Sequence, residues 1–192
     1  GLQVEFVLGN EDENGVVPYG YEDRVVSEFQ DKHGVSPFSL PNNDVDWMQF
    51  RSDYTTRVLS ESRDKIKQHF PDVSFSTTII AGEKEGYIKV LQDWPAWVDL
   101  GIVDEFYLWF RTDSNLKRLA HQTKYAADVI KGRCPLIVEL SCYHPGSFQE
   151  PDLMVEGARV ALANGANAIG VYRSQAVDQL DFWPVLEEIA RL

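Results

Sequence analysis

The feature that most constrains the fold is a regular alternation of strand-like and helix-like segments. Strand-like segments begin near residues 2, 73, 103, 136 and 168, and helix-forming segments separate them. The last three intervals are about 30 residues each, the size of one βαβ unit, whereas the first is about twice as long and carries an insertion. This alternation predicts an α/β fold in which helices cover a parallel sheet.

Periodicity and chain-breaking residues set the expected element boundaries. Gly34 lies just beyond the first expected helix, Pro71 stops the second, and the segment 36–46 has the Pro and Asn content of a turn-rich connector. The expected strands span residues 1–11, 73–80, 103–110, 136–142 and 168–172. The expected helices span residues 21–32, 47–70, 87–100, 116–131, 152–163 and 182–192.

The two faces of each expected strand differ, and this difference indicates the type of sheet. Successive side chains of a strand point to opposite faces. Glu139 and Ser141 alternate with Val138 and Leu140, and the segment 103–110 is built in the same way. A strand between two helix layers is apolar on both faces, whereas a TIM barrel carries its reacting groups at the C-terminal strand ends. We therefore expect a parallel (β/α) TIM-barrel type, with a partly open sheet as the alternative.

The number of repeating units predicts an incomplete barrel. About five β/α units are present, whereas a complete barrel has eight and about 250 residues. We expect residues 1–192 to form a single domain that is the C-terminal part of a (β/α)₈ barrel. A missing N-terminal half or a homo-oligomer would then complete the barrel and cover its open edges. Any export signal would lie in that missing part, so the localisation stays open, with secretion or a periplasmic location as alternatives.

Composition and charge narrow the classes of partner. A hydrophobic content of 44% in 192 residues is enough for one sizeable core. Lys and Arg number 18 against 30 Asp and Glu, and the net charge of −12 argues against nucleic acid and anionic membranes as partners. No apolar run approaches the roughly 18 residues of a membrane span. We therefore expect neither a nucleic-acid nor a membrane partner.

The cysteines and the acidic loop give no pattern typical of a metal site. Cys134 and Cys142 fit neither a disulfide framework nor metal-ligand spacing, and we expect buried thiols. Glu11, Asp12 and Glu13 form an acidic loop that we expect to be solvated, with a bound cation as the alternative. No cofactor and no metal are predicted.

One segment carries a resemblance to a known family. Residues 93–110, DWPAWVDLGIVDEFYLWF, resemble the element DW..W...G.vD of bacterial glycoside-hydrolase-like TIM barrels of the family-10-like type, the DUF187 group. Residues 1–6 are similar to the motif DG(I/V)HxDD on the family's fourth barrel strand, with Glu5 where the family has Asp. Residues 165–172 are similar to its last strand, GADGIxxY. The other matching positions are Trp47, Arg51, Asp93, Trp94, Trp97, Gly101 and Asp104.

The resemblance implies that the chain supplies barrel strands four to eight of a glycoside hydrolase. Such enzymes use two carboxyl groups, about 5–5.5 Å apart for retention and about 6.5–9.5 Å apart for inversion. The resemblance would make Glu5 the proton donor and Glu139 the nucleophile in the hydrolysis of a polysaccharide or oligosaccharide. The alternative is that both acids pair with Arg111 or Arg173 inside the barrel.

Other side chains near the strand ends are candidates for sugar binding. Five of them have a structural alternative to sugar binding. Tyr107 and Trp109 could pack in the core, Arg111 and Asp113 could pair with each other, and His144 could simply be solvated. Trp94 and Trp97 are expected to be packing residues. The candidate substrate-binding residues are Gln3, Tyr107, Trp109, Arg111, Asp113, Tyr143, His144, Tyr172 and Arg173.

Two other classes of function stay open at this point. One is a catalytically inactive barrel that binds carbohydrate or serves as an interaction domain. The other is an isomerase or aldolase barrel, although no lysine lies on the polar face of a predicted strand to form a Schiff base.

Overall fold

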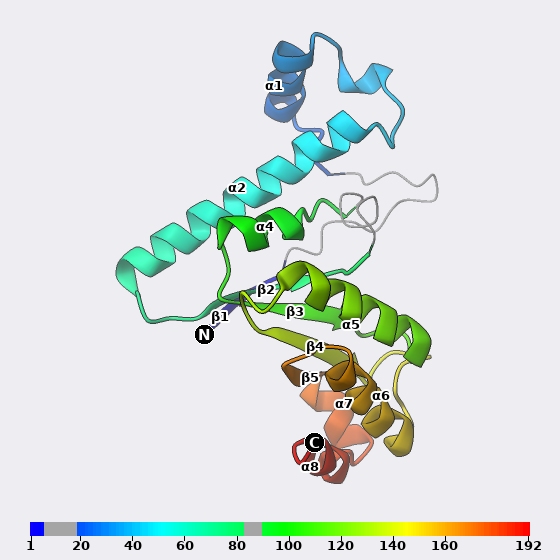
Figure 1. Ribbon diagram of the computed structural model, residues 1–192. Helices are drawn as coiled ribbons and strands as arrows, with labels where there is room; N and C mark the ends of the chain where they lie inside the picture. Colours follow the sequence, from blue (N-terminus) through cyan, green and yellow to red (C-terminus); the bar gives the residue numbers. More distant parts are fainter. Residues whose placement is uncertain (6–18, 83–89) are drawn as a thin grey trace.

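The computed structural model describes residues 1–5, 19–82 and 90–192. Its five strands form one parallel sheet in the order β1-β2-β3-β4-β5 (Figure 1). The strands are β1 (Leu2–Val4), β2 (Phe75–Ile79), β3 (Glu105–Phe110), β4 (Leu136–Ser141) and β5 (Ala168–Tyr172). The α-helices are α1 (Asp23–His33), α2 (Val45–His69), α4 (Trp94–Leu100), α5 (Leu116–Ile130), α6 (Pro151–Ala163), α7 (Ser174–Gln179) and α8 (Trp183–Ile189), and η1 (Pro37–Ser39) is a 3₁₀ helix.

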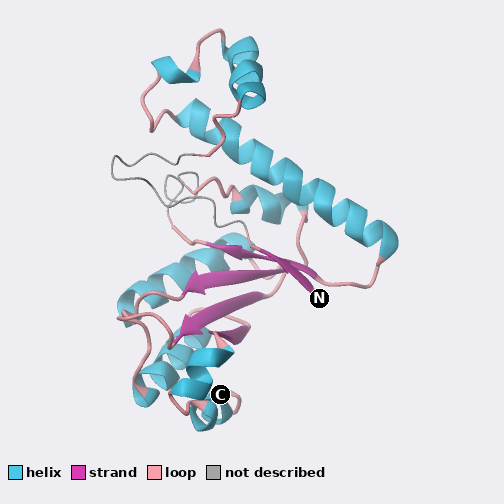
Figure 2. Ribbon diagram, turned by 180° about the vertical axis from the view of Figure 1, so that it is seen from behind, coloured by secondary structure: helices cyan, strands magenta, loops and turns pink. Residues whose placement is uncertain are grey.

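The sequential strand order confirms the predicted α/β fold and favours the barrel type. A doubly wound sheet reverses its strand order at a switch point and carries helices on both faces. Here every strand pairs with its neighbours along the chain. Helices α4, α5 and α6 lie on one face of the sheet, and Figure 2 shows the other face. The described strands leave β1 and β5 as edges, so the sheet is open.

The main core fills the space between the sheet and these helices. Every second residue of β3, namely Phe106, Leu108 and Phe110, is buried there, and so are Val138 and Leu140 of β4. The apolar strand face predicted from the alternation is therefore the helix-packed face. The helices contribute the buried side chains of Trp94, Trp97, Leu119, Ala126, Met154 and Ala158.

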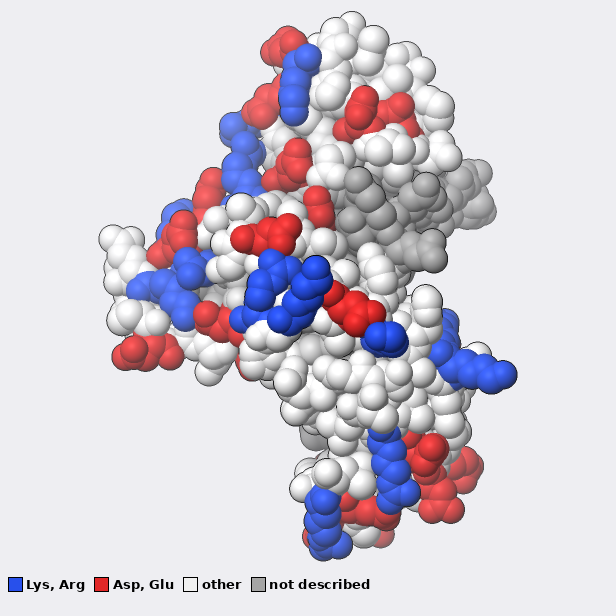
Figure 3. Space-filling view, in the orientation of Figure 1, with Lys and Arg blue, Asp and Glu red and all other residues white. Residues whose placement is uncertain are grey.

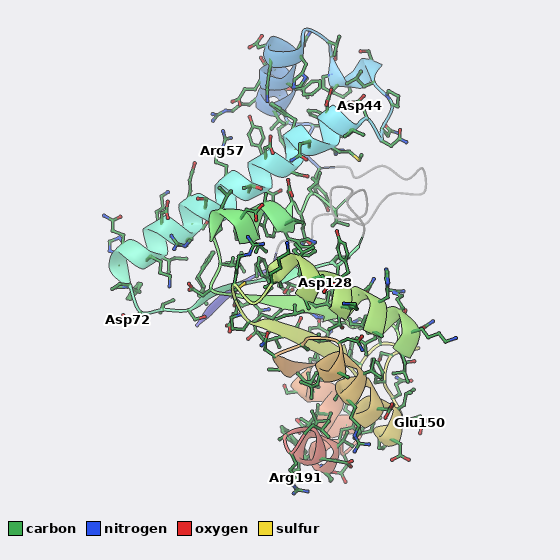
Figure 4. All side chains as sticks on the ribbon, viewed as in Figure 1. Asp44, Arg57, Asp72, Asp128, Glu150 and Arg191 are labelled. Carbon is green, nitrogen blue, oxygen red and sulfur yellow. The ribbon has the colours of Figure 1, made fainter. Side chains whose placement is uncertain are left out.

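The long first interval contains a helical insertion with a small core of its own. Helix α1 lies at the end of α2 that is remote from the sheet (Figure 1), and Phe29, Trp47 and Phe50 form a second buried cluster there. Asp44 caps α2 by accepting a hydrogen bond from the Trp47 amide at 3.0 Å. Asp44 and Asp72 lie near the two ends of this helix (Figure 4).

The matching positions Asp93, Trp94, Trp97 and Gly101 of the family-like segment 93–110 have structural roles. The Asp93 side chain caps α4, and it also accepts a hydrogen bond from Gln49 Nε2 at 2.9 Å. Trp94 and Trp97 are fully buried, which confirms that they are packing residues. Gly101 ends the helix with a positive φ of 61°, a conformation that glycine adopts without strain.

Asp104 and Asn167 link neighbouring strands where those strands begin. Asp104, just before β3, accepts from the Phe75 amide at 2.7 Å and donates its own amide to the Phe75 carbonyl at 2.8 Å. Asn167, just before β5, makes the same two bonds with Leu136, at 2.8 and 2.7 Å. Lys67 of α2 adds an ion pair to Asp104 at 2.7 Å. The same device thus sets the register of two strand pairs.

Some predicted boundaries differ from the structure. The helix expected over 87–100 begins at Trp94, because Pro95 fits only the first turn of a helix, and residues 87–89 lie outside the described residues. Residues 6–11 of the first expected strand and the acidic loop at Glu11, Asp12 and Glu13 lie outside the described residues too. Helix α7 was not predicted, and the connector 36–46 contains η1.

Acidic and basic side chains are mixed on the surface. On the face drawn in Figure 3, basic and acidic side chains alternate along α2. None of the described helices has both the length and the apolar content that crossing a membrane would require.

Candidate functional site

The candidate residues gather on the face of the sheet that α4, α5 and α6 leave uncovered. The register pairs Trp109 with Glu139 and Glu139 with Gly170, and it pairs Ser141 with Tyr172. Because all five strands are parallel, their C-terminal ends meet at one edge of the sheet. The polar side chains of β3 and β4 therefore converge with the residue that follows β1, which is Glu5.

Arg111 joins the two predicted carboxylates. Its Nη2 atom donates to Glu139 Oε2 at 2.5 Å and also to Glu5 Oε1, and its Nε atom donates to Glu139 Oε2 at 3.1 Å. Two hydrogen bonds that meet at one nitrogen hold their acceptor oxygens within about 6 Å of each other. The separation is thus compatible with the arrangement of two acids around one glycosidic bond.

This pairing is one of the alternatives left open by the sequence. Both acids pair with Arg111, and neither pairs with Arg173. The three residues, Glu5, Arg111 and Glu139, form what we call the acid–arginine cluster.

The two acids of the cluster differ in their exposure to solvent. The side chain of Glu139 is 11% exposed and that of Glu5 is 42% exposed. Burial raises the pKa of Glu139 above its ordinary value, the bonds from Arg111 oppose this shift, and the charge of Glu5 adds to it. Burial lowers the pKa of Arg111, but its bonds to Glu5 and Glu139 outweigh burial and raise it overall. Arg111 therefore stays charged.

Gln3 and Thr78 extend the cluster along the sheet. Gln3 Nε2 donates to Thr78 Oγ1 at 3.1 Å, and Thr78 Oγ1 donates to Glu5 Oε1 at 3.3 Å. Thr78 was not among the predicted site residues, although its place on the polar face of β2 was a signal. Gly170 was missed as well. A Cβ there would lie 3.3 Å from Glu139 Cγ, so the glycine leaves space for that side chain.

Two aromatic rings pack against the guanidinium group of Arg111. The Cζ atom of Arg111 lies 4.8 Å from the ring centroid of Trp109 and 4.2 Å from that of Tyr172. His144 stacks nearly parallel to Tyr172, at 6.0 Å and 4°, so it is not simply solvated. Tyr143 meets the ring of Tyr172 edge-on at 6.4 Å.

Two other predicted residues lie outside these contacts. Asp113 pairs with Arg118 at 2.6 Å and accepts a hydrogen bond from the Asn115 amide, so the alternative in which it pairs with Arg111 is wrong. Its position in the turn after β3 gives it these local partners instead. Tyr107 shares the polar face, and burial, with a smaller contribution from the charge of Glu105, raises its pKa.

No metal-binding arrangement is found in the described parts of the chain. Within residues 1–5, 19–82 and 90–192, no three His, Cys, Asp or Glu side chains are grouped so that they could hold a metal ion. Cys142 is buried as predicted, and Cys134 is partly buried. Burial raises the pKa of both thiols. The acidic loop at Glu11 lies outside the described residues.

Comparison with known proteins identifies one family. The family model described as Glycosyl hydrolase-like 10 matches residues 12–141, which is more than half of the chain. The matched range includes Arg111 and Glu139 but ends before Tyr143, and it begins after Glu5. No curated protein matches the chain.

Proposed function

Because the chain belongs to the Glycosyl hydrolase-like 10 family, we propose that it hydrolyses O-glycosidic bonds in a polysaccharide or oligosaccharide. The observation that carries this proposal is the acid–arginine cluster, in which one guanidinium holds two carboxylates at the C-terminal ends of the strands. This is the end at which barrel enzymes carry their reacting groups.

The two acids have environments that suit different roles. A glycosidase needs one carboxyl group that holds a proton and one that is ionised. The family resemblance gives the proton to Glu5, whereas the raised pKa belongs to the more buried Glu139. We assign the pair to catalysis jointly. Either role requires the acting carboxylate to exchange a bond with Arg111 for a contact with the substrate.

The rings and polar groups around the cluster suit a sugar ligand. Trp109, Tyr143 and Tyr172 offer apolar ring surfaces, while Gln3 and His144 carry groups able to donate and accept hydrogen bonds. In the proposed site these side chains orient the sugar relative to the two acids.

The test compares three glutamate variants in the full chain against a panel of polysaccharides. Glu139→Gln and Glu5→Gln should each lower the release of reducing ends by at least about 100-fold, the scale of lost general acid–base catalysis. Glu105→Gln is the matched control, because Glu105 lies on β3 near the opposite end of that strand and accepts from Ser74 Oγ at 3.2 Å. It should leave turnover unchanged. Full activity of Glu139→Gln would refute the assignment.

A carbohydrate-binding barrel without catalysis is the second candidate. The pairing of both acids with Arg111 favours it, because carboxylates held in ion pairs can serve to hold the strands together without taking part in a reaction. Binding of a sugar by the wild-type chain with no turnover of any polymer in the panel would select this function.

We also propose that the chain supplies strands four to eight of a barrel. The sequential strand order and the two edges that the described strands leave unpaired support this view. An apolar groove beside the free edge of β5 supports it as well. The groove is lined by residues that include Ile169, Val171, Leu186 and Ile189. A preceding set of β/α units, or a second copy of the chain, would cover this groove.

A further inference from the structure

Arg173 has a charge that no described residue balances. Seven other arginines of the described chain pair with a carboxylate, for example Arg118 with Asp113 and Arg191 with Glu187. Arg173 makes no ion pair with any residue that the structure describes, and its Nε atom is buried without a hydrogen-bond partner. Arg57 likewise makes no ion pair with a described residue, and its Cζ atom lies 4.2 Å from the ring centroid of Tyr54. Arg173 differs from Arg57 in its position, which is at the end of β5.

The position of Arg173 connects it to the acid–arginine cluster. Its Cζ atom lies 3.8 Å from the ring centroid of Tyr143 and 5.1 Å from that of Tyr172. The same Tyr172 ring lies 4.2 Å from Cζ of Arg111. Arg173 and Arg111 therefore contact the same tyrosine ring, at the C-terminal edge of the sheet.

The two arginines differ in what they can still bind. Arg111 is bound to Glu5 and Glu139, so its charge is compensated. A guanidinium that stacks on a ring uses its flat face, and its N–H groups lie in the plane and remain free to donate. A ligand carboxylate would supply two acceptor oxygens in a geometry that matches the two terminal nitrogens of Arg173, which are not among the buried atoms without a partner.

We propose that Arg173 binds a carboxylate of the sugar that occupies the position next to the acid–arginine cluster. The substrate class is then an acidic glycan, in which a carboxylated sugar lies beside the bond that is cleaved. This inference rests on the proposed function, since it describes the specificity of that same site.

The experiment uses pairs of ligands that differ only in the carboxylate. Oligosaccharides prepared from polyglucuronate and polygalacturonate are compared with the same oligosaccharides after reduction of each carboxyl group to a primary alcohol. Binding to the full wild-type chain is measured by calorimetry. At least one acidic form should bind about ten- to a hundred-fold more tightly than its reduced form, the scale of one charge-assisted hydrogen-bonded contact.

Variants of Arg173 then separate recognition from packing. Arg173→Gln should abolish the preference for the acidic form, and Arg173→Lys should retain part of it, because the ammonium keeps the charge without the planar fork. Arg191→Gln is the control. Arg191 lies near the C-terminal end of the chain (Figure 4), and its side chain pairs only loosely with Glu187, at 3.5 Å. A purely structural Arg173 would weaken both forms of the ligand equally.

The outcomes distinguish this inference from the proposed hydrolysis. Equal binding of both forms, binding of neither, or a preference that survives in Arg173→Gln would overturn the role of Arg173. An acidic preference that depends on Arg173, without any release of reducing ends, would support the carboxylate site and count against hydrolysis. Cleavage of reduced and acidic forms at equal rates would support hydrolysis and count against the carboxylate site.

Discussion

Removal of the Arg111 guanidinium should destabilise the fold, and the loss should grow with pH. The Arg111 side chain is 4% exposed and binds two carboxylates. Methionine has a similar unbranched length and can pack between Trp109 and Tyr172, so Arg111→Met removes mainly the charge and the hydrogen bonds. What remains is a buried carboxylate at Glu139 without a partner of opposite charge.

The expected magnitude follows from the exposure of the two acids. Removing one partner of a buried ion pair lowers the free energy of unfolding by about 3–5 kcal/mol. Glu5 is 42% exposed and can be hydrated, so most of the loss comes from Glu139, whose side chain is 11% exposed. We therefore expect the lower end, about 3 kcal/mol at neutral pH.

The pH dependence has a definite sign. Burial already raises the pKa of Glu139 above 4.5, and Arg111 is the group that opposes this rise. Without Arg111 the folded-state pKa rises further, so the folded chain binds more protons than the unfolded chain above the unfolded-state pKa. Stability then falls as the pH rises from that value through the folded-state pKa.

Urea denaturation at about pH 5 and about pH 8 measures this effect. Arg111→Met should lose more stability at the higher pH, and the double variant Arg111→Met/Glu139→Gln should recover much of the loss because the buried charge is gone. Arg191→Met, at an exposed arginine, should stay within about 0.5 kcal/mol of the wild type. An equal loss at both pH values, or no rescue by Glu139→Gln, would refute the electrostatic explanation.

Two further predictions concern the strand starts and the open sheet. Burial pushes the pKa of Asp104 upward, but the bonds from Lys67 and the Phe75 amide outweigh it and hold the pKa below 3.8. Asp104→Asn should therefore lower the free energy of unfolding by about 1 kcal/mol at neutral pH. That difference should disappear as acid protonates Asp104 in the wild type, and a difference that persists in acid would count against the ion pair. If the chain is five-eighths of a barrel, sedimentation at increasing concentration should show self-association that a separately expressed N-terminal half suppresses. A chain that stays monomeric and ignores that half would contradict the barrel proposal.

The sequence predicts the sheet well because its signals are local and repeated. The alternation of Phe106, Leu108 and Phe110 with polar neighbours gives the helix-packed face of β3 directly, and the spacing of the units gives the parallel order. Short helices are harder to predict, because fewer than about 12 residues have little intrinsic helical stability and depend on tertiary contacts. Helix α7, with six residues, is such a case. The start of α4 at Trp94 has a different cause, because Pro95 fits only the first turn of a helix.

The candidate site is predicted in part for a related reason. Strand parity alone places Glu139 and Arg111 on one face, and the structure brings them together. Partner choice needs more than parity. Asp113 lies only two residues after Arg111, but it is in the turn beyond the strand. Its partners are therefore the nearby Asn115 amide and the Arg118 side chain. Likewise, the partners of Thr78 come from a strand more than 70 residues away in sequence, which no local pattern reveals.

The side chains at the two ends of the strands make different kinds of contact, and this difference explains how the sheet accommodates the acid–arginine cluster. At the N-terminal ends, Asp104 and Asn167 satisfy backbone amides of the neighbouring strands and hold the register. At the C-terminal ends, Glu139 remains buried with a raised pKa, an arrangement that lowers stability at neutral pH and that packing alone would not need. Because register is already fixed at the strand starts, the strand ends are free to hold charged groups close together. A buried acid held next to a second acid by one arginine therefore supports the proposed role of this edge in catalysis.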